Sequence, residues 1–174
     1  MRDERAAQFQ AVFRTGLPYV LQSLRRLGVR ERDVEDVTQE VFLAVYPRLG
    51  DYDPSRPLRR WLFGFARRMA SDYRKRASVQ REVLDDAQEP RDQGAAADER
   101  LGDQAQRRLL LRALDALDQR SRETFVMYYL DDTPTPEIAA ELGDSEDAVT
   151  SRLRRAVEKV TAEVQRLQRK AAPR

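Results

Sequence analysis

The chain has 174 residues, 36% of them charged and 41% hydrophobic, a composition typical of a soluble protein rich in helices. It contains neither cysteine nor histidine, which excludes disulfides, the usual zinc sites and the commonest general base. We therefore expect no enzyme activity, no metal and no other cofactor. The net charge of +2 is small, so a surface for nucleic acid requires positive charge gathered in one part of the chain.

The sequence gives no sign of a membrane protein. No apolar run reaches the length of a membrane span, and the first ten residues lack the apolar core of a signal peptide. We expect a cytoplasmic protein without membrane insertion.

The first half of the chain predicts four helices. The first is expected over residues 3–14 and the second over 18–27, because Gly16 and Pro18 interrupt the helical pattern and Pro18 suits a first turn. Asp33 is expected to cap the third. Its predicted buried stripe consists of Val34, Val37, Val41, Ala44 and Val45, and its opposite face is acidic.

A turn-forming loop over residues 50–57 leads to the fourth helix, which is expected to end at Arg76. Its predicted packing face consists of Leu58, Trp61, Leu62, Phe65, Met69 and Tyr73. Arg56, Arg60, Arg67 and Arg74 align on the other side. Arginines near exposed rings suit nucleic acid, because they neutralise phosphate while the rings receive unstacked bases. Taken alone, however, the helix favours the simpler interpretation of a packed core with a solvated charged face.

An acidic segment over residues 77–104 separates the two halves. It carries eight acidic residues and three arginines, with no apolar period. We predict a flexible linker there, between a first domain over residues 1–76 and a second over 105–170. Domains of this length are small and marginally stable, which favours stabilising partners.

The second half predicts helices over residues 109–117 and 122–130, the latter behind an Asp118 cap. Thr135 is expected to cap a short helix that ends at Leu142. A longer helix follows behind a Ser145 cap.

The last two helices have the order of a helix-turn-helix: a short helix, a glycine turn and a longer helix. Gly143 permits a left-handed turn, and Val149 is expected to pack between the two helices. Candidate donors for phosphates and guanine edges follow the turn, namely Thr150, Ser151, Arg152, Arg154 and Arg155.

Three separated motifs in this order resemble those of the extracytoplasmic function (ECF) family of RNA polymerase sigma factors. They lie at residues 36–42, at 61–67 with 72–74 downstream, and at 137–153. The resemblance runs from about Phe9 to Leu167. It implies an all-α fold of two small helical domains, sigma regions 2 and 4, joined by a flexible linker. It also implies that the protein directs RNA polymerase to promoters and initiates transcription.

The resemblance assigns a role to each candidate surface. Polymerase core, through its beta-prime subunit, would bind Asp36, Gln39 and Glu40. The minus-ten element, held as a single strand, would meet Tyr52, Arg56, Arg59, Arg60, Phe63, Arg67 and Arg74. The minus-thirty-five duplex would meet the donors after the helix-turn-helix turn. The implied partners are RNA polymerase core (beta and beta-prime subunits), promoter DNA and an anti-sigma factor, and we place Trp61 in the core.

Three acids at the start of the recognition helix, Asp144, Glu146 and Asp147, complement the helix dipole but oppose DNA phosphates. We therefore expect weak duplex binding by the free protein. These acids also support one alternative, a sigma-like decoy that binds an anti-sigma factor without touching DNA. The basic stripe argues against that alternative. A stand-alone helix-turn-helix regulator would use only residues 104–167 and leave the acidic face without a role.

Overall fold

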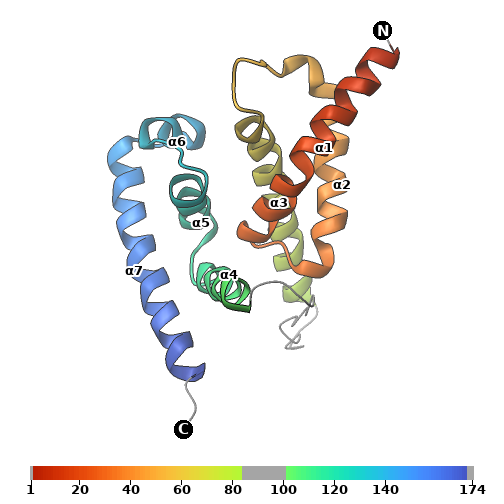
Figure 1. Cartoon of the computed structure of the whole chain (residues 1–174). Helices are drawn as coiled ribbons and strands as arrows, with labels where there is room; N and C mark the ends of the chain where they lie inside the picture. The colour runs from red at the N-terminus through yellow and green to blue at the C-terminus, as the bar shows by residue number, and fades with distance from the viewer. Residues whose placement is uncertain (1, 84–100, 172–174) are drawn as a thin grey trace. The chain divides into compact units, whose positions relative to one another are not determined.

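The computed structural model describes residues 2–83 and 101–171, and within these ranges every regular element is helical, as Figure 1 shows. The all-α fold class is thereby confirmed. The chain divides into two compact units, residues 1–95 and 96–174. In the described ranges no helix is both long enough and apolar enough to cross a bilayer.

The N-terminal unit is a bundle of α1 (Arg2–Arg26), α2 (Val34–Val45) and α3 (Leu58–Val83), and each of these three helices packs against the other two. A 3₁₀ turn, Glu31–Asp33, leads into α2, and a second, Tyr46–Asp51, follows it. Aliphatic side chains from all three helices form the core. Fully buried members include Val20, Leu24, Val41, Val45 and Leu62.

Helix α1 is continuous, so the predicted break at residues 15–18 is wrong. Pro18 lies inside the helix, where its ring removes one backbone donor but stays exposed. Gly16 serves packing and not a turn, because a methyl group at this position would overlap the Cδ1 atom of Leu62 on α3. Burial of one face of α1 against two other helices outweighs the local cost of the proline.

The buried face of α3 also differs from the prediction. Its fully buried residues are Leu62, Phe63, Ala66 and Ala70, whereas Trp61, Phe65, Met69 and Tyr73 are only partly covered. The two alanines are small and permit close approach of the neighbouring helices α1 and α2. Because alanine is only weakly hydrophobic, it contributes little to a helical pattern in which large rings dominate. The helix also continues to Val83, beyond the predicted end at Arg76.

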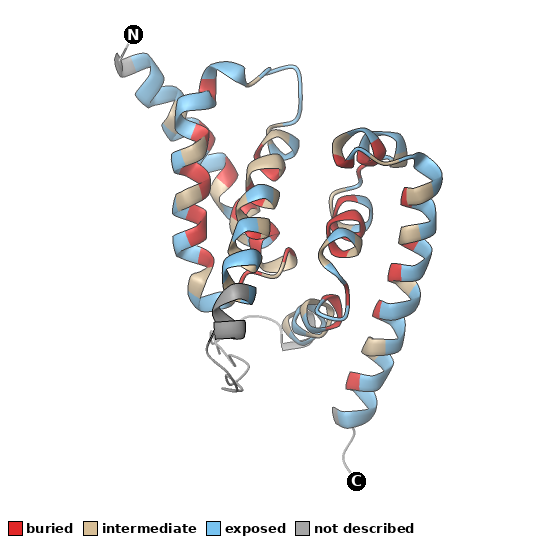
Figure 2. Ribbon diagram, turned by 180° about the vertical axis from the view of Figure 1, so that it is seen from behind, coloured by how far each residue is buried: buried red, intermediate tan, exposed pale blue. Residues whose placement is uncertain are grey.

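The C-terminal unit contains α4 (Leu101–Leu114), α5 (Gln119–Phe125), a π-helical turn (Val126–Leu130), α6 (Thr135–Leu142) and α7 (Glu146–Ala171). Helix α7 packs against the other three. Figure 2 shows its buried positions along one side, and these include Val149, Leu153, Ala156 and Val160. The single helix predicted over residues 122–130 is therefore two shorter pieces, of which α5 begins earlier.

Local signals for helix ends are confirmed at three positions of the C-terminal unit. The Asp118 carboxylate accepts from the Ser121 backbone N–H at 2.9 Å, and Ser145 Oγ accepts from the Ala148 N–H at 3.2 Å. Gly143 adopts the left-handed conformation, with φ of +67°. Thr135, in contrast, is the first residue of α6 and not its cap, because the cap position belongs to Pro134.

Asp33 precedes α2 but its side chain does not cap it. The carboxylate instead accepts from the hydroxyl group of Tyr73 on α3, at 2.6 Å. The 3₁₀ turn before α2 holds Asp33 in a near-helical conformation, which turns its carboxylate away from the first N–H groups. Burial, together with this hydrogen bond, raises the pKa of Tyr73 above its ordinary value.

Both ends of the acidic segment predicted to be a linker are helical. Helix α3 covers residues 77–83 and α4 covers 101–104. The remaining part, residues 84–100, lies outside the described residues, and so does the expectation of flexibility there.

Candidate nucleic-acid and polymerase interface

The exposed face of α2 carries the residues expected at a polymerase interface. Asp36 and Gln39 are exposed, and Glu40 is partly covered because it accepts from the Arg76 guanidinium of α3 at 3.1 Å. Leu43 lies one turn farther along and is 74% exposed. The spacing of these residues places Asp36, Glu40 and Leu43 on one stripe. The face is therefore acidic with an apolar end.

Leu43 was missed by reasoning from the sequence. The available signal was its spacing of three from Glu40 and four from Gln39, together with its place outside the buried valine stripe. Apolar area flanked by charged side chains agrees with the general plan of a protein interface, which has an apolar centre and a polar rim.

The loop before α3 is held by its own side chains. The Tyr52 hydroxyl donates to the Arg56 carbonyl at 3.0 Å, and Asp53 Oδ1 accepts from the Ser55 N–H at 2.9 Å. The Tyr52 ring contacts the Trp61 ring, with centroids 5.1 Å apart. Both rings are half-buried, so Trp61 is not the core residue that we expected but part of a ring pair at the surface.

Three arginines belong to the same segment of the chain as this ring pair. Arg56 is 79% exposed, with Asp53 3.7 Å from its Nε atom, and Arg60 is exposed as well. Arg59 lies over the ring of Tyr19 on α1, 5.7 Å from its centroid. The loop and the first turn of α3 thus carry three exposed arginines and two partly exposed rings, a combination suited to single-stranded nucleic acid.

Three other predicted minus-ten residues lie apart from this group. Phe63 is 97% buried in the bundle, so we correct its assignment to a core residue, for the reason that it continues the Ala66 and Ala70 stripe. Arg67 and Arg74 are half-buried farther along α3. A rise of about 1.5 Å per residue places them about 10 and 20 Å beyond Arg60.

The helix-turn-helix presents four of its five predicted donors. Thr150, Ser151, Arg154 and Arg155 are exposed on one face of α7, and Arg155 Nε donates to the Ser151 carbonyl at 3.3 Å. Hydroxyl and guanidinium donors on one helix face are the groups that read phosphates and base edges.

Arg152 lies elsewhere. Its side chain is only 16% exposed and donates to Asp144 at 2.7 Å and to the Thr124 hydroxyl at 3.4 Å. A helical repeat explains this position, because Arg152 falls between Val149 and Ala156 on the buried side of α7. The expected DNA contact is therefore a member of an internal ion pair.

Asp144 accepts from a second arginine as well, Arg120 of α5, at 3.2 Å. Arg120 also donates to the Leu142 carbonyl at the end of α6. The hydrogen bond from Arg152, followed by that from Arg120, lowers the pKa of Asp144 from its ordinary value. Two guanidinium groups thus balance one of the three acids at the start of the recognition helix.

Known protein families match both units. The family described as Sigma-70 region 2 matches residues 12–79, and Sigma-70 region 4 matches residues 107–160. The chain is similar to the RNA polymerase sigma factor CnrH of Cupriavidus metallidurans, with 37% identity over 88% of this chain and 84% of the relative. It is also similar to the ECF RNA polymerase sigma factor SigL of Mycobacterium tuberculosis, with 30% identity over 93% of this chain and 92% of that protein.

Two solved structures share the fold. The structure of CnrH in complex with the cytosolic domain of CnrY has a TM-score of 0.61 and 30% identity, over 90% of this chain and 87% of that one. The sigma factor RpoE in complex with the anti-sigma factor NepR from Bartonella quintana has a TM-score of 0.59 and 23% identity, over 88% and 96%.

Proposed function

We propose, since this chain belongs to the ECF family of RNA polymerase sigma factors, that its two units bind polymerase and promoter DNA through separate surfaces. As a sigma factor it directs RNA polymerase to promoters, and it belongs to a class of DNA-binding regulators. Beyond this family role, we propose which residues of this chain make each contact. It assigns sigma region 2 to residues 1–76 and region 4 to residues 105–170, acting in the cytoplasm by binding and not by catalysis.

The polymerase contact is the acidic face of α2. Asp36, Gln39 and Glu40 supply charge and polarity, and the exposed Leu43 supplies apolar area beside them. Electrostatic complementarity with a basic partner surface sets the register of such an interface, and burial of the leucine side chain removes apolar area from water. The Arg76–Glu40 ion pair is exposed, so its loss on binding costs little.

The minus-ten contact is the loop and the first turn of α3. The ring pair of Tyr52 and Trp61 offers a stacking surface, and Arg56, Arg59 and Arg60 are exposed in the same segment. Extraction of a base from the duplex costs a few kcal/mol. Stacking of about 1–3 kcal/mol per base, with phosphate contacts, offsets that cost. Arg67 and Arg74 extend the basic track along the helix.

The minus-thirty-five contact is the exposed face of α7, with Thr150, Ser151, Arg154 and Arg155. An anti-sigma factor is a further partner, because the similar protein CnrH was solved with the cytosolic domain of CnrY. The single observation that carries the whole proposal is the match of regions 2 and 4 to the two units in the order that the fold shows.

Reversal of charge on α2 tests the polymerase contact. Asp36→Lys with Glu40→Lys should weaken assembly with bacterial core polymerase about tenfold or more, because like charges across an interface cost several kcal/mol. Fluorescence anisotropy of the labelled full chain measures it. Asp147→Lys with Glu158→Lys, both exposed on α7, makes the same change in net charge and is the control. Equal affinities for the two double variants would reject the assignment of α2.

Run-off transcription on a library of randomised promoters tests the function as a whole. The wild-type holoenzyme should select and transcribe templates that share two sequence elements. A holoenzyme that assembles but transcribes none of them would identify a sigma-like decoy instead.

A further inference from the structure

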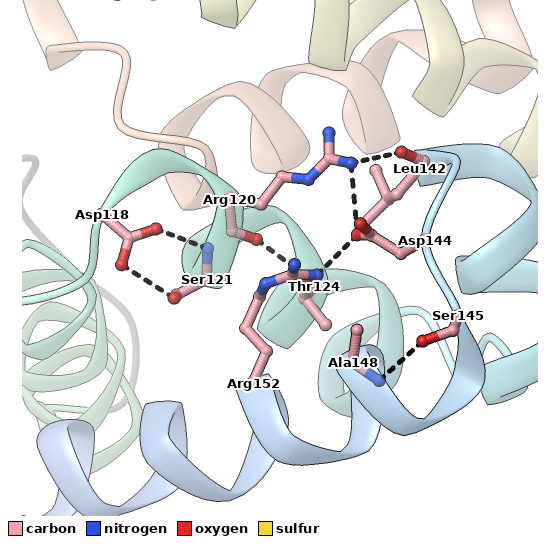
Figure 3. A network of polar contacts seen from close by, with 9 residues as sticks. All are labelled: Asp118, Arg120, Ser121, Thr124, Leu142, Asp144, Ser145, Ala148 and Arg152. Carbon is pink, nitrogen blue, oxygen red and sulfur yellow. Dashed lines mark hydrogen bonds and ion pairs between the residues drawn. The ribbon is translucent and has the colours of Figure 1, made fainter.

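Asp144 lies in the turn between α6 and α7, where three elements of the C-terminal unit meet. Figure 3 shows its carboxylate between the guanidinium groups of Arg120 and Arg152. The Arg152 contact, at 2.7 Å, comes from the recognition helix itself, and the Arg120 contact, at 3.2 Å, comes from α5.

Both arginines make a second contact that fixes their direction. Arg120 donates to the carbonyl of Leu142, the last residue of α6, and Arg152 donates to the Thr124 hydroxyl on α5. The Thr124 hydroxyl in turn donates to the Arg120 carbonyl at 2.8 Å. The network therefore joins α5, the end of α6, the turn and the second turn of α7 into one set of polar contacts.

The charges in this network decide what Arg152 is free to do. Its side chain is 16% exposed and that of Asp144 is 18% exposed, so this contact is largely covered. Removal of one partner from a covered ion pair leaves the other charge without compensation, which is costly. The conformation in which Arg152 contacts Asp144 is therefore favoured over one in which its side chain turns toward DNA.

We propose that Asp144 is a positioning residue, which sets the angle of the recognition helix by holding Arg152 and Arg120. This inference rests on the proposed reading of the minus-thirty-five element by α7. Arg155 lies about 16 Å along the helix from Asp144, so a tilt of a few degrees at the turn moves its donors by about 1 Å. Hydrogen bonds to base edges do not tolerate such a shift well.

The proposal also changes the meaning of the acidic start of α7. If Asp144 acted only as a negative charge near phosphates, its neutralisation would strengthen DNA binding. If it positions α7, neutralisation weakens the preference for the correct sequence. The two interpretations therefore predict different results for the same substitution: tighter promoter binding in the first case, and a weaker preference at minus-thirty-five positions in the second.

Holoenzymes of wild-type chain and variants, assembled with bacterial core polymerase, are tested by selection from a randomised promoter library. Asp144→Asn keeps the shape and removes the charge. We expect it to reduce the preference at minus-thirty-five positions about tenfold, while the preference at minus-ten positions stays. Asp147→Asn removes an exposed charge from the first turn of α7 and is the matched control, expected to keep both preferences. Asp144→Glu, which restores the carboxylate, should recover part of the loss.

Arg152→Ala provides a second, independent variant. We expect the same loss of minus-thirty-five preference without a change in the salt dependence of promoter binding, because Arg152 touches no phosphate. The double variant Asp144→Asn with Arg152→Ala should be no worse than either single one. Each selection is run at a temperature at which circular dichroism shows the variant folded.

Three results would overturn the proposal. They are a wild-type minus-thirty-five preference in Asp144→Asn, tighter promoter binding by it, or a salt slope in Arg152→Ala lower by about one phosphate contact. A wild-type holoenzyme that selects no minus-thirty-five element at all would instead refute the proposed function of α7. The two failures are thus distinguishable.

Discussion

Single side chains fix the points where helices of the C-terminal unit begin. Asp118 accepts from both the backbone N–H and the hydroxyl of Ser121, at 2.9 and 2.8 Å. Burial alone would raise the pKa of Asp118, but these hydrogen bonds outweigh it and lower the pKa. The carboxylate therefore stabilises the start of α5 in its charged form.

The first prediction concerns this cap. Asp118→Ala should lower the free energy of unfolding by about 1 kcal/mol, the usual value of a lost N-cap. For a domain of this size that corresponds to a fall of roughly 4–8 °C in Tm. Thermal melting followed by circular dichroism measures it, with Gln106→Ala, exposed on α4, as the control. No difference between the two variants would show that the cap contributes nothing.

The second prediction concerns pH. The lowered pKa of Asp144 means that its stabilising contacts are fully present above its ordinary value of 3.8 and are lost as the pH falls through the folded-state pKa. Asp144→Asn should therefore be less stable than the wild type at pH 7, and the difference in Tm should shrink as the pH falls below that value. Melting curves across this range measure it. A difference that persists unchanged in strong acid would contradict the assigned role of the charge.

At the scale of helices, close approach of α1 and α3 depends on a residue without a side chain. Gly16 faces the fully buried Leu62, whereas Gly64 of α3 has open space around its Cα. The same substitution should thus have opposite effects at two glycines that both lie inside helices.

The third prediction follows from this pair. Gly16→Ala should destabilise the N-terminal unit by about 1–3 kcal/mol, because overpacking exceeds the gain in helix propensity. Gly64→Ala should instead stabilise it by up to about 1 kcal/mol. Urea unfolding of the full chain measures both. Stabilisation by Gly16→Ala would show that the two helices separate readily at this point.

At the scale of the whole molecule, a net charge of +2 conceals separate acidic and basic surfaces. The acidic face lies on α2, whereas exposed arginines lie at the start of α3 and on α7. Each basic surface belongs to a different unit, so losses at the two should add in free energy.

The fourth prediction tests that separation. Arg56→Ala with Arg60→Ala should slow opening of the minus-ten element, reported by the fluorescence of a base analogue. Arg154→Ala with Arg155→Ala should weaken closed-complex binding, and each pair should lower the salt slope by about two. Arg169→Ala, exposed in the last turn of α7, is the control. Interchanged effects of the two pairs would refute the division of labour.

The sequence alone determined the features that depend on residues close together in the chain. It identified the all-α class and the cap at Asp118. It also identified the helix-turn-helix, with its left-handed turn at Gly143 and its cap at Ser145. Such features were predictable because the groups involved lie within a few residues of one another. The family motifs were recognisable for a related reason, since their order and spacing are properties of the chain itself.

Tertiary structure decided everything that depends on which face of a helix meets another helix. Packing of α1 against α3 kept α1 continuous through Pro18 and gave Gly16 its role. Phe63 lies in the core on the same face of α3 as Ala66 and Ala70, and the contact between Asp144 and Arg152 holds an expected DNA donor away from the surface. The continuity of α1 and the role of Gly16 depend on contact with a helix distant in sequence, which helical periodicity does not encode. Phe63 and Arg152 agree with the helical repeat of their buried neighbours, but only the packing shows which face of each helix is buried.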